Sequence, residues 1–107
     1  MELHLSIEKE LATARAAILE NNEGKARVCA RRAIVLTVQN SPVSGQTQWN
    51  SRLALEYLTN ADMFPSEIVK AAKRLQGGLR AQLQGEEYSE NSIEDAKINI
   101  CYFLDLP

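Results

Sequence analysis

The chain has 107 residues, of which 45% are hydrophobic and 24% are charged, and its formal net charge is −2. This length fits one domain with a single core over residues 1–107, and the hydrophobic content excludes a disordered tail. Because the net charge is mildly acidic, bulk attraction to nucleic acid is weak, and any phosphate binding has to rest on a local group of cations.

The first residues, the apolar runs and the two cysteines indicate the environment in which we expect the protein to occur. The longest apolar run, residues 33–38, is interrupted by Thr37 and is too short to cross a membrane, and the first residues lack a signal-peptide pattern. We therefore expect a cytoplasmic protein without a membrane partner. Cys29 and Cys101 both lie in apolar helical patterns, which predicts two buried free thiols. Together with a distant His4 they have no metal-site spacing, so we expect neither a metal nor a cofactor.

The first predicted helix covers about residues 6–20, because apolar residues recur there at helical spacing. Its stripe consists of Leu3, Ile7, Leu11, Ala14 and Ile18. Residues 21–24, Asn-Asn-Glu-Gly, are typical of a short turn with a left-handed helix cap. A second helix should therefore run antiparallel to the first and pack directly against it.

The second predicted helix covers about residues 25–39 and has two distinct faces. One is a ridge of small side chains that lets a neighbouring backbone come close: Ala26, Ala30, Ala33 and Thr37. The other is cationic in its first half and apolar in its second: Arg27, Arg31, Ile34 and Val38. This change predicts that the far end of the helix enters the core or an interface between two copies. Residues 40–46 have the composition of a loop.

The third predicted helix covers about residues 47–61, with Trp49, Leu53 and Tyr57 on one stripe. Pro65 marks the first turn of a fourth helix, because proline is preorganised for that position. Its apolar seam is Ile68, Ala72, Leu75, Leu79 and Leu83. The pair Gly77-Gly78 should weaken, bend or end this helix.

The last predicted helix starts at Ser92, which resembles a capping box together with Asp95. Its apolar stripe is Ile93, Ala96, Ile100 and Leu104. No segment alternates with a period of two over the length of a strand. The sequence therefore predicts an all-α fold, an up-and-down antiparallel bundle of four to five helices.

Residues 24–52 contain five basic residues and no acid. Four of them, which we call the basic patch, are the candidate contacts for a phosphate ligand or a partner: Lys25, Arg27, Arg31 and Arg32. Guanidinium groups pair bidentately with phosphate oxygens, which favours this hypothesis. The alternative is a solvated helix face whose arginines pair with the acidic first and last helices and add little stability.

Other charged or aromatic residues are open to the same two interpretations. A second basic stripe follows the fourth helix: Lys70, Lys73, Arg74 and Arg80. Trp49 and Tyr57 are of the type that stacks on bases, but they share a stripe with Leu53, which favours packing. His4 has no nucleophile or acid beside it in a recognisable motif, so the sequence predicts no catalytic residues and no enzyme.

Residues 10–20, the Asn-Gly turn and the segment from Ala26 to Ala33 resemble the opening of HEPN domains, the higher-eukaryote and prokaryote nucleotide-binding domains. The second helix of that family carries small residues at an Ala-x3-Ala-x2-Ala spacing, matched here by Ala26, Ala30 and Ala33. The resemblance implies a compact antiparallel bundle, usually homodimeric, with functional residues facing a cleft between protomers. Many members are RNases with an Arg-x4–6-His motif, or act in toxin–antitoxin pairs. Here the single histidine, His4, precedes every arginine, so that motif is absent.

Three functional hypotheses remain. The first is a non-catalytic HEPN-like module, homodimeric, that binds a nucleotide, RNA or another phosphate ligand through the basic patch. The second is a protein–protein adaptor or an antitoxin-like subunit of a toxin–antitoxin pair. The third is a DNA-binding protein that uses residues 65–83 as a recognition helix, which the glycine pair and the acidic net charge oppose.

Overall fold

A computed structural model describes residues 2–40, 48–77, 79–86 and 88–104, and these residues form six helices and no strand. The helices are α1 (Glu2–Leu19), α2 (Glu23–Gln39), α3 (Ser51–Leu58), α4 (Ser66–Gln76), α5 (Leu79–Leu83) and α6 (Ser92–Leu104). The predicted all-α class is confirmed. Among the helices described, none has the combination of length and apolar character needed to cross a membrane.

The sixth helix arises because the predicted fourth helix is divided. α4 ends at Gln76, and Gly77 leaves the helix with extended backbone angles, φ −76° and ψ 136°. The expected helix break is thereby confirmed at Gly77, while Gly78 lies outside the described residues. At the last position of the predicted apolar seam, Leu83 in α5 is 77% exposed, so the seam does not extend to the end of α5.

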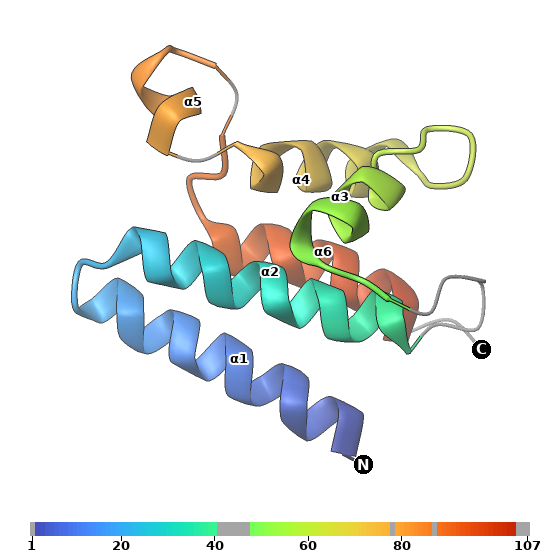
Figure 1. Cartoon of the computed structure of the whole chain (residues 1–107), viewed down its shortest axis with the longest axis horizontal. Helices are drawn as coiled ribbons and strands as arrows, with labels where there is room; N and C mark the ends of the chain where they lie inside the picture. Colours follow the sequence, from blue (N-terminus) through green and yellow to red (C-terminus); the bar gives the residue numbers. More distant parts are fainter. Residues whose placement is uncertain (1, 41–47, 78, 87, 105–107) are drawn as a thin grey trace.

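α1 and α2 form an antiparallel hairpin (Figure 1). Asn21 adopts φ 61° in the turn, as the predicted left-handed cap requires. Asn22 then caps α2, its side-chain oxygen accepting a hydrogen bond from the Lys25 amide at 3.1 Å. The small-residue ridge is confirmed, since all four of its residues are buried: Ala26, Ala30, Ala33 and Thr37.

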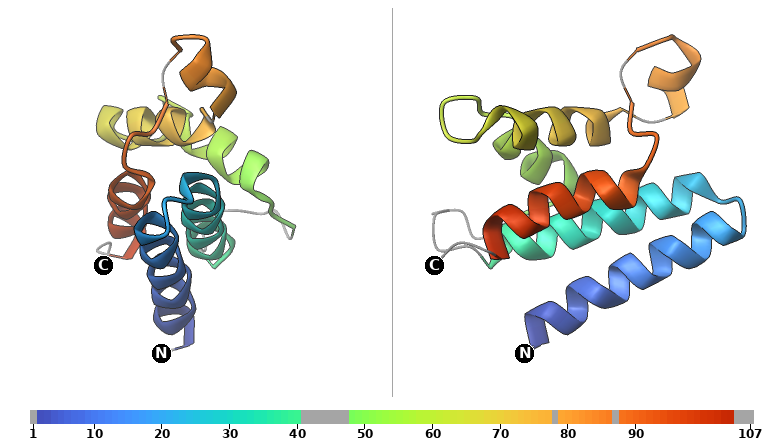
Figure 2. Two further views of the ribbon diagram at one scale, coloured as in Figure 1. Left: turned by 90° about the vertical axis from the view of Figure 1, so that its left-hand side faces the viewer. Right: turned by 180° about the vertical axis from the view of Figure 1, so that it is seen from behind.

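The remaining helices build a second layer on this hairpin. α6 lies beside α2 and runs in the same direction, while α3 and α4 lie across the other side of this pair (Figures 1 and 2). The arrangement therefore differs from a simple up-and-down bundle, because the neighbouring helices α2 and α6 run parallel (Figure 2). The core lies where the layers meet, and its largest fully buried side chains include Ile34, Leu58, Ile68 and Leu75.

The apolar second half of α2 enters this core, which is one of the two destinations that the sequence predicts. Ile34 and Val38 are both buried, and their neighbours are residues of this same chain. The other predicted destination is an interface between two copies. Ile34 and Val38 are not exposed, so they are not available for such an interface.

Several local predictions are corrected. α3 begins at Ser51 and not near Thr47, because the Asn50 side chain accepts a hydrogen bond from the Leu53 amide at 2.9 Å and starts the helix there. Cys29 is buried as expected, but Cys101 is exposed, since it lies on the solvent side of α6. Most of the predicted loop, residues 41–46, lies outside the described residues.

Candidate functional site

The basic patch does not form one cluster, because its residues point to two sides of α2. Lys25 and Arg32 are exposed, whereas Arg27 and Arg31 are half-buried. The division follows from helix geometry, since residues four apart share a face and residues five apart do not. The two half-buried arginines face the α4–α6 side of the molecule, so they are the members of the basic patch that line cavities.

Arg31 holds the end of α4. Its Nε and Nη2 atoms donate hydrogen bonds to the main-chain oxygen of Leu75, at 2.9 and 2.6 Å. Leu75 lies in the last turn of α4, where main-chain oxygens have no partner within the helix and the helix dipole favours a cation. Arg31 therefore stabilises the position where the chain leaves α4.

This environment affects the charge of Arg31. Burial lowers the pKa of Arg31 below its usual value, and the nearby positive charge of Arg27 lowers this pKa further. An arginine stays protonated at neutral pH despite such shifts. Among the described residues, no carboxylate is bound to Arg31. Within the described part of the chain, Arg31 is thus a half-buried positive charge that is bound by a neutral carbonyl oxygen alone.

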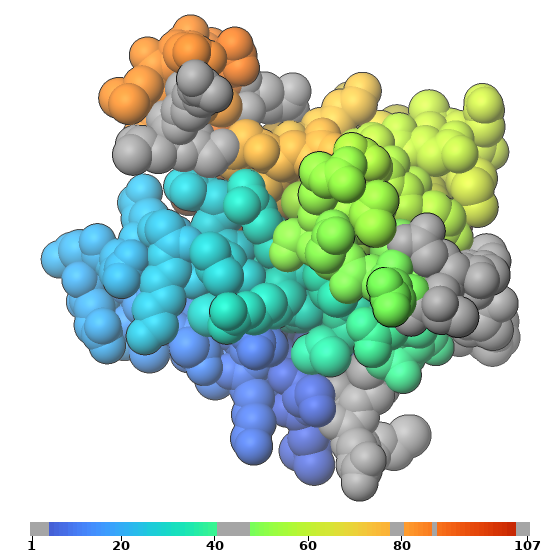
Figure 3. All heavy atoms as spheres, in the orientation of Figure 1, coloured from blue at the N-terminus to red at the C-terminus, as the bar shows by residue number. Residues whose placement is uncertain are grey.

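Arg31 also lines a cavity of about 300 Å³ where α2, α3 and α4 meet. The other described residues around this cavity are Arg52 and Leu55 of α3 and Gln76 at the end of α4. Figure 3 shows the face of the molecule on which these three helices meet. The cavity therefore combines two guanidinium groups, a side-chain amide and one apolar wall.

Arg52 is the residue that the predicted site lacked. It belongs to the same acid-free stretch as the basic patch, but it lies in a different helix, so residue spacing along α2 gives no indication of it. Arg52 pairs with Glu56, with Nη1 3.2 Å from Oε1, and both side chains are largely exposed. Exposed pairs of this kind in a helix contribute about 0.3–0.5 kcal/mol, so Arg52 can exchange Glu56 for another anion at little cost.

Arg27 lies in a different and less cationic setting. It lines a smaller cavity of about 150 Å³, and the walls of this cavity include Glu23 and Glu90. These two carboxylates offset the charge of Arg27. Of the two cavities lined by residues of the basic patch, the one beside Arg31 is therefore better suited to an anion.

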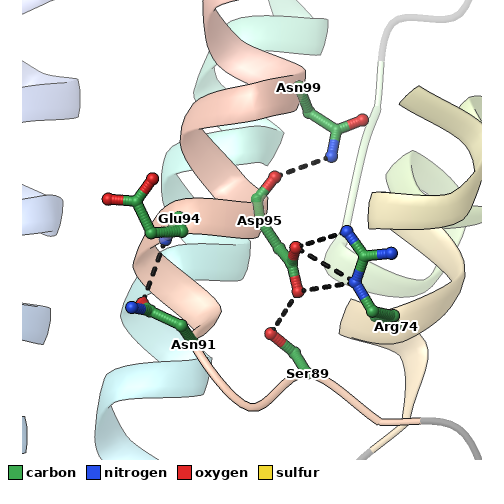
Figure 4. A network of polar contacts seen from close by, with 6 residues as sticks. All are labelled: Arg74, Ser89, Asn91, Glu94, Asp95 and Asn99. Carbon is green, nitrogen blue, oxygen red and sulfur yellow. Dashed lines mark hydrogen bonds and ion pairs between the residues drawn. The ribbon is translucent and has the colours of Figure 1, made fainter. Parts of the chain in front are cut away.

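The second basic stripe is partly used by the fold. Arg74 of α4 forms an ion pair with Asp95 of α6, with Nη2 2.7 Å from Oδ1 (Figure 4). Ser89 donates a hydrogen bond to Oδ2 of the same carboxylate at 2.5 Å. Arg74 therefore fits the alternative interpretation of the basic residues, in which arginines pair with an acidic helix of the same chain.

The start of α6 differs from the predicted capping box. Asn91 is the residue before the helix, and its side-chain oxygen accepts a hydrogen bond from the Glu94 amide at 3.1 Å. Asp95 instead turns to Arg74 and Ser89. The capping-box prediction was wrong because a distant arginine and a nearby hydroxyl provide the carboxylate with stronger partners than a main-chain amide does.

The aromatic residues form a packed chain and not an open stacking platform. Trp49 and Tyr57 lie with ring centroids 5.4 Å apart, and Tyr57 meets Phe64 at 5.2 Å in an edge-to-face contact. Both Trp49 and Tyr57 pack against the core, which confirms the packing interpretation. Trp49 Nε1 and the Tyr57 hydroxyl are buried and have no hydrogen-bond partner in the described part of the chain.

The described residues contain no group of three or more His, Cys, Asp or Glu side chains placed to hold a metal ion. Comparisons with protein-family models, with curated proteins and with solved structures give no match to this chain.

Proposed function

We propose that this protein is a non-catalytic, HEPN-like helical binding module whose ligand carries a phosphate group and binds in the Arg31–Arg52 cavity. The observation that carries the proposal is the convergence of Arg31 and Arg52, from two different helices, on one cavity of about 300 Å³. Two guanidinium groups that face one space match the oxygens of a phosphate, with which each can form paired hydrogen bonds.

Arg31 can bind a ligand without releasing α4. A guanidinium group has five N–H donors, and two donor atoms of Arg31 are directed at the Leu75 oxygen. The N–H groups of Nη1 remain for a phosphate oxygen. Because Arg31 is held by Leu75 before the ligand arrives, little side-chain entropy is lost on binding.

The rest of the cavity suits a small phosphorylated compound such as a nucleotide. Gln76 provides both an amide donor and a carbonyl acceptor, and Leu55 provides an apolar wall for a base or sugar. The cavity volume lies at the lower end of the range of about 300–1,000 Å³ that is typical of small-molecule sites. A mononucleotide or the end of an RNA strand fits this pattern better than a duplex does.

Titration of the purified protein with inorganic phosphate, AMP and ATP by calorimetry tests the proposal. The informative variant is Arg52→Gln, because Arg52 is exposed and its loss should leave the fold intact. We expect this variant to bind AMP at least about tenfold more weakly than the wild type, as the loss of a charge-assisted contact implies. A short single-stranded RNA tests whether the ligand is a nucleotide or a strand.

The matched control is Arg32→Gln, which removes the same charge from the exposed side of α2. We expect this variant to bind AMP as the wild type does. An equal loss of affinity in both variants would show general attraction to positive charge and would contradict a site at Arg52. Absence of binding by the wild type at millimolar ligand would also reject the proposal.

An adaptor or antitoxin-like role is the second candidate, and the observation that favours it is the exposure of large apolar side chains on α1. Leu5 is 65% exposed and Leu19 is 86% exposed. Copurification of a partner from the native host, such as a nucleotidyltransferase encoded beside this protein, would support that role. The DNA-binding hypothesis gains no comparable support, because Arg74 is engaged with Asp95 and α4 ends at Gln76.

A further inference from the structure

The outer face of α1 is exposed from Leu5 to Leu19. α1 packs chiefly against α2 and lies at the edge of the molecule (Figures 1 and 2). Leu5 and Leu19 stand at the two ends of this face, with the exposed residues Ala12 and Ala16 between them. At about 100° per residue these four positions fall within about 60° of arc, over a length of about 21 Å. We call them the α1 outer stripe.

The first half of this stripe borders a shallow, open depression in the surface. A surface cavity of about 580 Å³ is lined by Leu5, Ser6, Glu8, Lys9 and Ala12. Four of these residues follow the spacing i, i+3, i+4 and i+7: Leu5, Glu8, Lys9 and Ala12. That spacing forms the four-residue hole which receives a side chain from a second helix in knobs-into-holes packing. The small side chain of Ala12 leaves the space open.

We infer that the α1 outer stripe binds the same stripe of a second copy of this chain, with the two α1 helices antiparallel about a twofold axis at Ala12. In this register Leu5 of one copy lies opposite Leu19 of the other. Side chains of a helix lean toward its N-terminus, so Leu19 of each copy leans from that position into the hollow beside Ala12. A leucine that is 86% exposed thereby gains a complementary site.

The charges beside the stripe select this orientation. Glu8 and Arg15 lie on the same flank of α1, seven residues apart, and both are exposed. A twofold axis at Ala12 places Glu8 of each copy next to Arg15 of the other, which gives two ion pairs. Lys9 lies on the opposite flank, away from Arg15 of the second copy. A parallel arrangement would instead place the flank of Glu8 and Arg15 beside the opposite flank of the other copy, so neither of these two ion pairs would form.

Glu8 and Arg15 are available for these contacts. Neither forms an ion pair or a side-chain hydrogen bond with another residue in the described ranges. The α1 outer stripe is a dimer surface distinct from α2. Ile34 and Val38 of α2 are buried in the core. The inference is independent of the phosphate site, because none of the residues of the α1 outer stripe lines the Arg31–Arg52 cavity.

One helix from each copy makes a small interface, so the dimer should be weak. We expect a dissociation constant on the order of 10–100 µM, in keeping with the smallest class of specific interfaces. Sedimentation velocity of the wild type from about 5 to about 500 µM should then show the change from monomer to dimer. A wild type that stays monomeric throughout this range would overturn the inference, whatever other protein α1 binds.

Two charge reversals test the register. Glu8→Arg and Arg15→Glu each place like charges together in both ion pairs, so each variant alone should dimerise at least about tenfold more weakly. A mixture of the two variants restores both pairs, since the two cations of the Glu8→Arg chain then face the two carboxylates of the Arg15→Glu chain. We expect the mixture to form the heterodimer at concentrations where each variant alone is monomeric.

Controls separate this surface from a general effect of charge and from misfolding. Arg32→Glu makes the same charge reversal on the exposed side of α2 and should dimerise as the wild type does. Ala12→Leu fills the hollow and should abolish dimerisation, while circular dichroism shows an unchanged helix content. Dimerisation that is unaffected by Ala12→Leu, or a mixture that stays monomeric, would show that the α1 outer stripe is not the contact.

Discussion

Arg74 in α4 and Asp95 in α6, which are 21 residues apart in the chain, form a bidentate ion pair that joins the two helices. Arg74 Nη2 lies 2.7 Å from Asp95 Oδ1, and Nε lies 3.1 and 3.2 Å from the two carboxylate oxygens. The Asp95 side chain is 9% exposed, whereas that of Arg74 is 32% exposed. Ser89 completes the contacts of this carboxylate. Arg74 therefore balances the negative charge of a carboxylate that is largely shielded from water.

Removing Arg74 should destabilise the fold strongly. Arg74→Met leaves the Asp95 carboxylate buried without its cation, and we expect the free energy of unfolding to fall by about 2–4 kcal/mol. Chemical denaturation followed by circular dichroism measures this change. The control is Arg52→Gln, which breaks an exposed pair and should cost less than about 0.5 kcal/mol. Similar losses in the two variants would show that burial of Asp95 is unimportant.

The hydroxyl of Tyr57 should make stability depend on pH in the alkaline range. Burial raises the pKa of Tyr57 above its ordinary value, and the neighbouring Tyr102 raises this pKa further. The unfolded chain therefore releases this proton first as the pH rises, which favours unfolding. The contribution of Tyr57 to stability is complete below its ordinary pKa of about 10 and is lost as the pH rises toward the folded value.

Tyr57→Phe isolates this effect. At neutral pH the variant should be as stable as the wild type or slightly more stable, because the buried hydroxyl has no hydrogen-bond partner among the described residues. Between about pH 9 and pH 11, the melting temperature of the wild type should fall more steeply than that of the variant. Parallel curves for the two proteins would contradict the raised pKa.

The small-residue ridge of α2 should tolerate no added bulk. Ala30 is fully buried, and Ala30→Leu would force neighbouring helices away from α2 at a cost of about 1–3 kcal/mol. Thermal unfolding measures the loss. Gln39→Leu adds similar apolar bulk at an exposed position of the same helix and should change stability by less than about 0.5 kcal/mol. If Ala30→Leu were as stable as Gln39→Leu, close packing along the ridge would be excluded.

The sequence predicts most of the helices because their signals are local. The alanine ridge of α2 is buried, as are three of the four residues in the apolar stripe of α6, and Asn21 forms the expected left-handed turn. The break at Gly77 also appears where the glycine pair predicts it. Each of these features depends on residues within a few positions of one another, where helix periodicity and backbone preferences decide the outcome.

The contacts that were not predicted join residues far apart in the chain. The local sequence predicts Asp95 as part of a cap, since nothing near it in the chain indicates that Arg74 lies beside it. Arg31 contacts the main-chain oxygen of Leu75, a group that residue types cannot reveal. Arg52 joins the candidate site only because α3 packs beside α2. The composition of this site therefore follows from the packing of the helices and not from any motif.

The position of α6 beside both α2 and α4 has a consequence for the order of folding. The α1–α2 hairpin consists of near neighbours in the chain, so it can close early and rapidly. The core between α2 and α4 lacks Ile93, Ala96 and Ile100 until α6 has been synthesised. During translation the chain should therefore carry a formed hairpin beside exposed apolar surface, and it should gain cooperative stability only when α6 emerges from the ribosome.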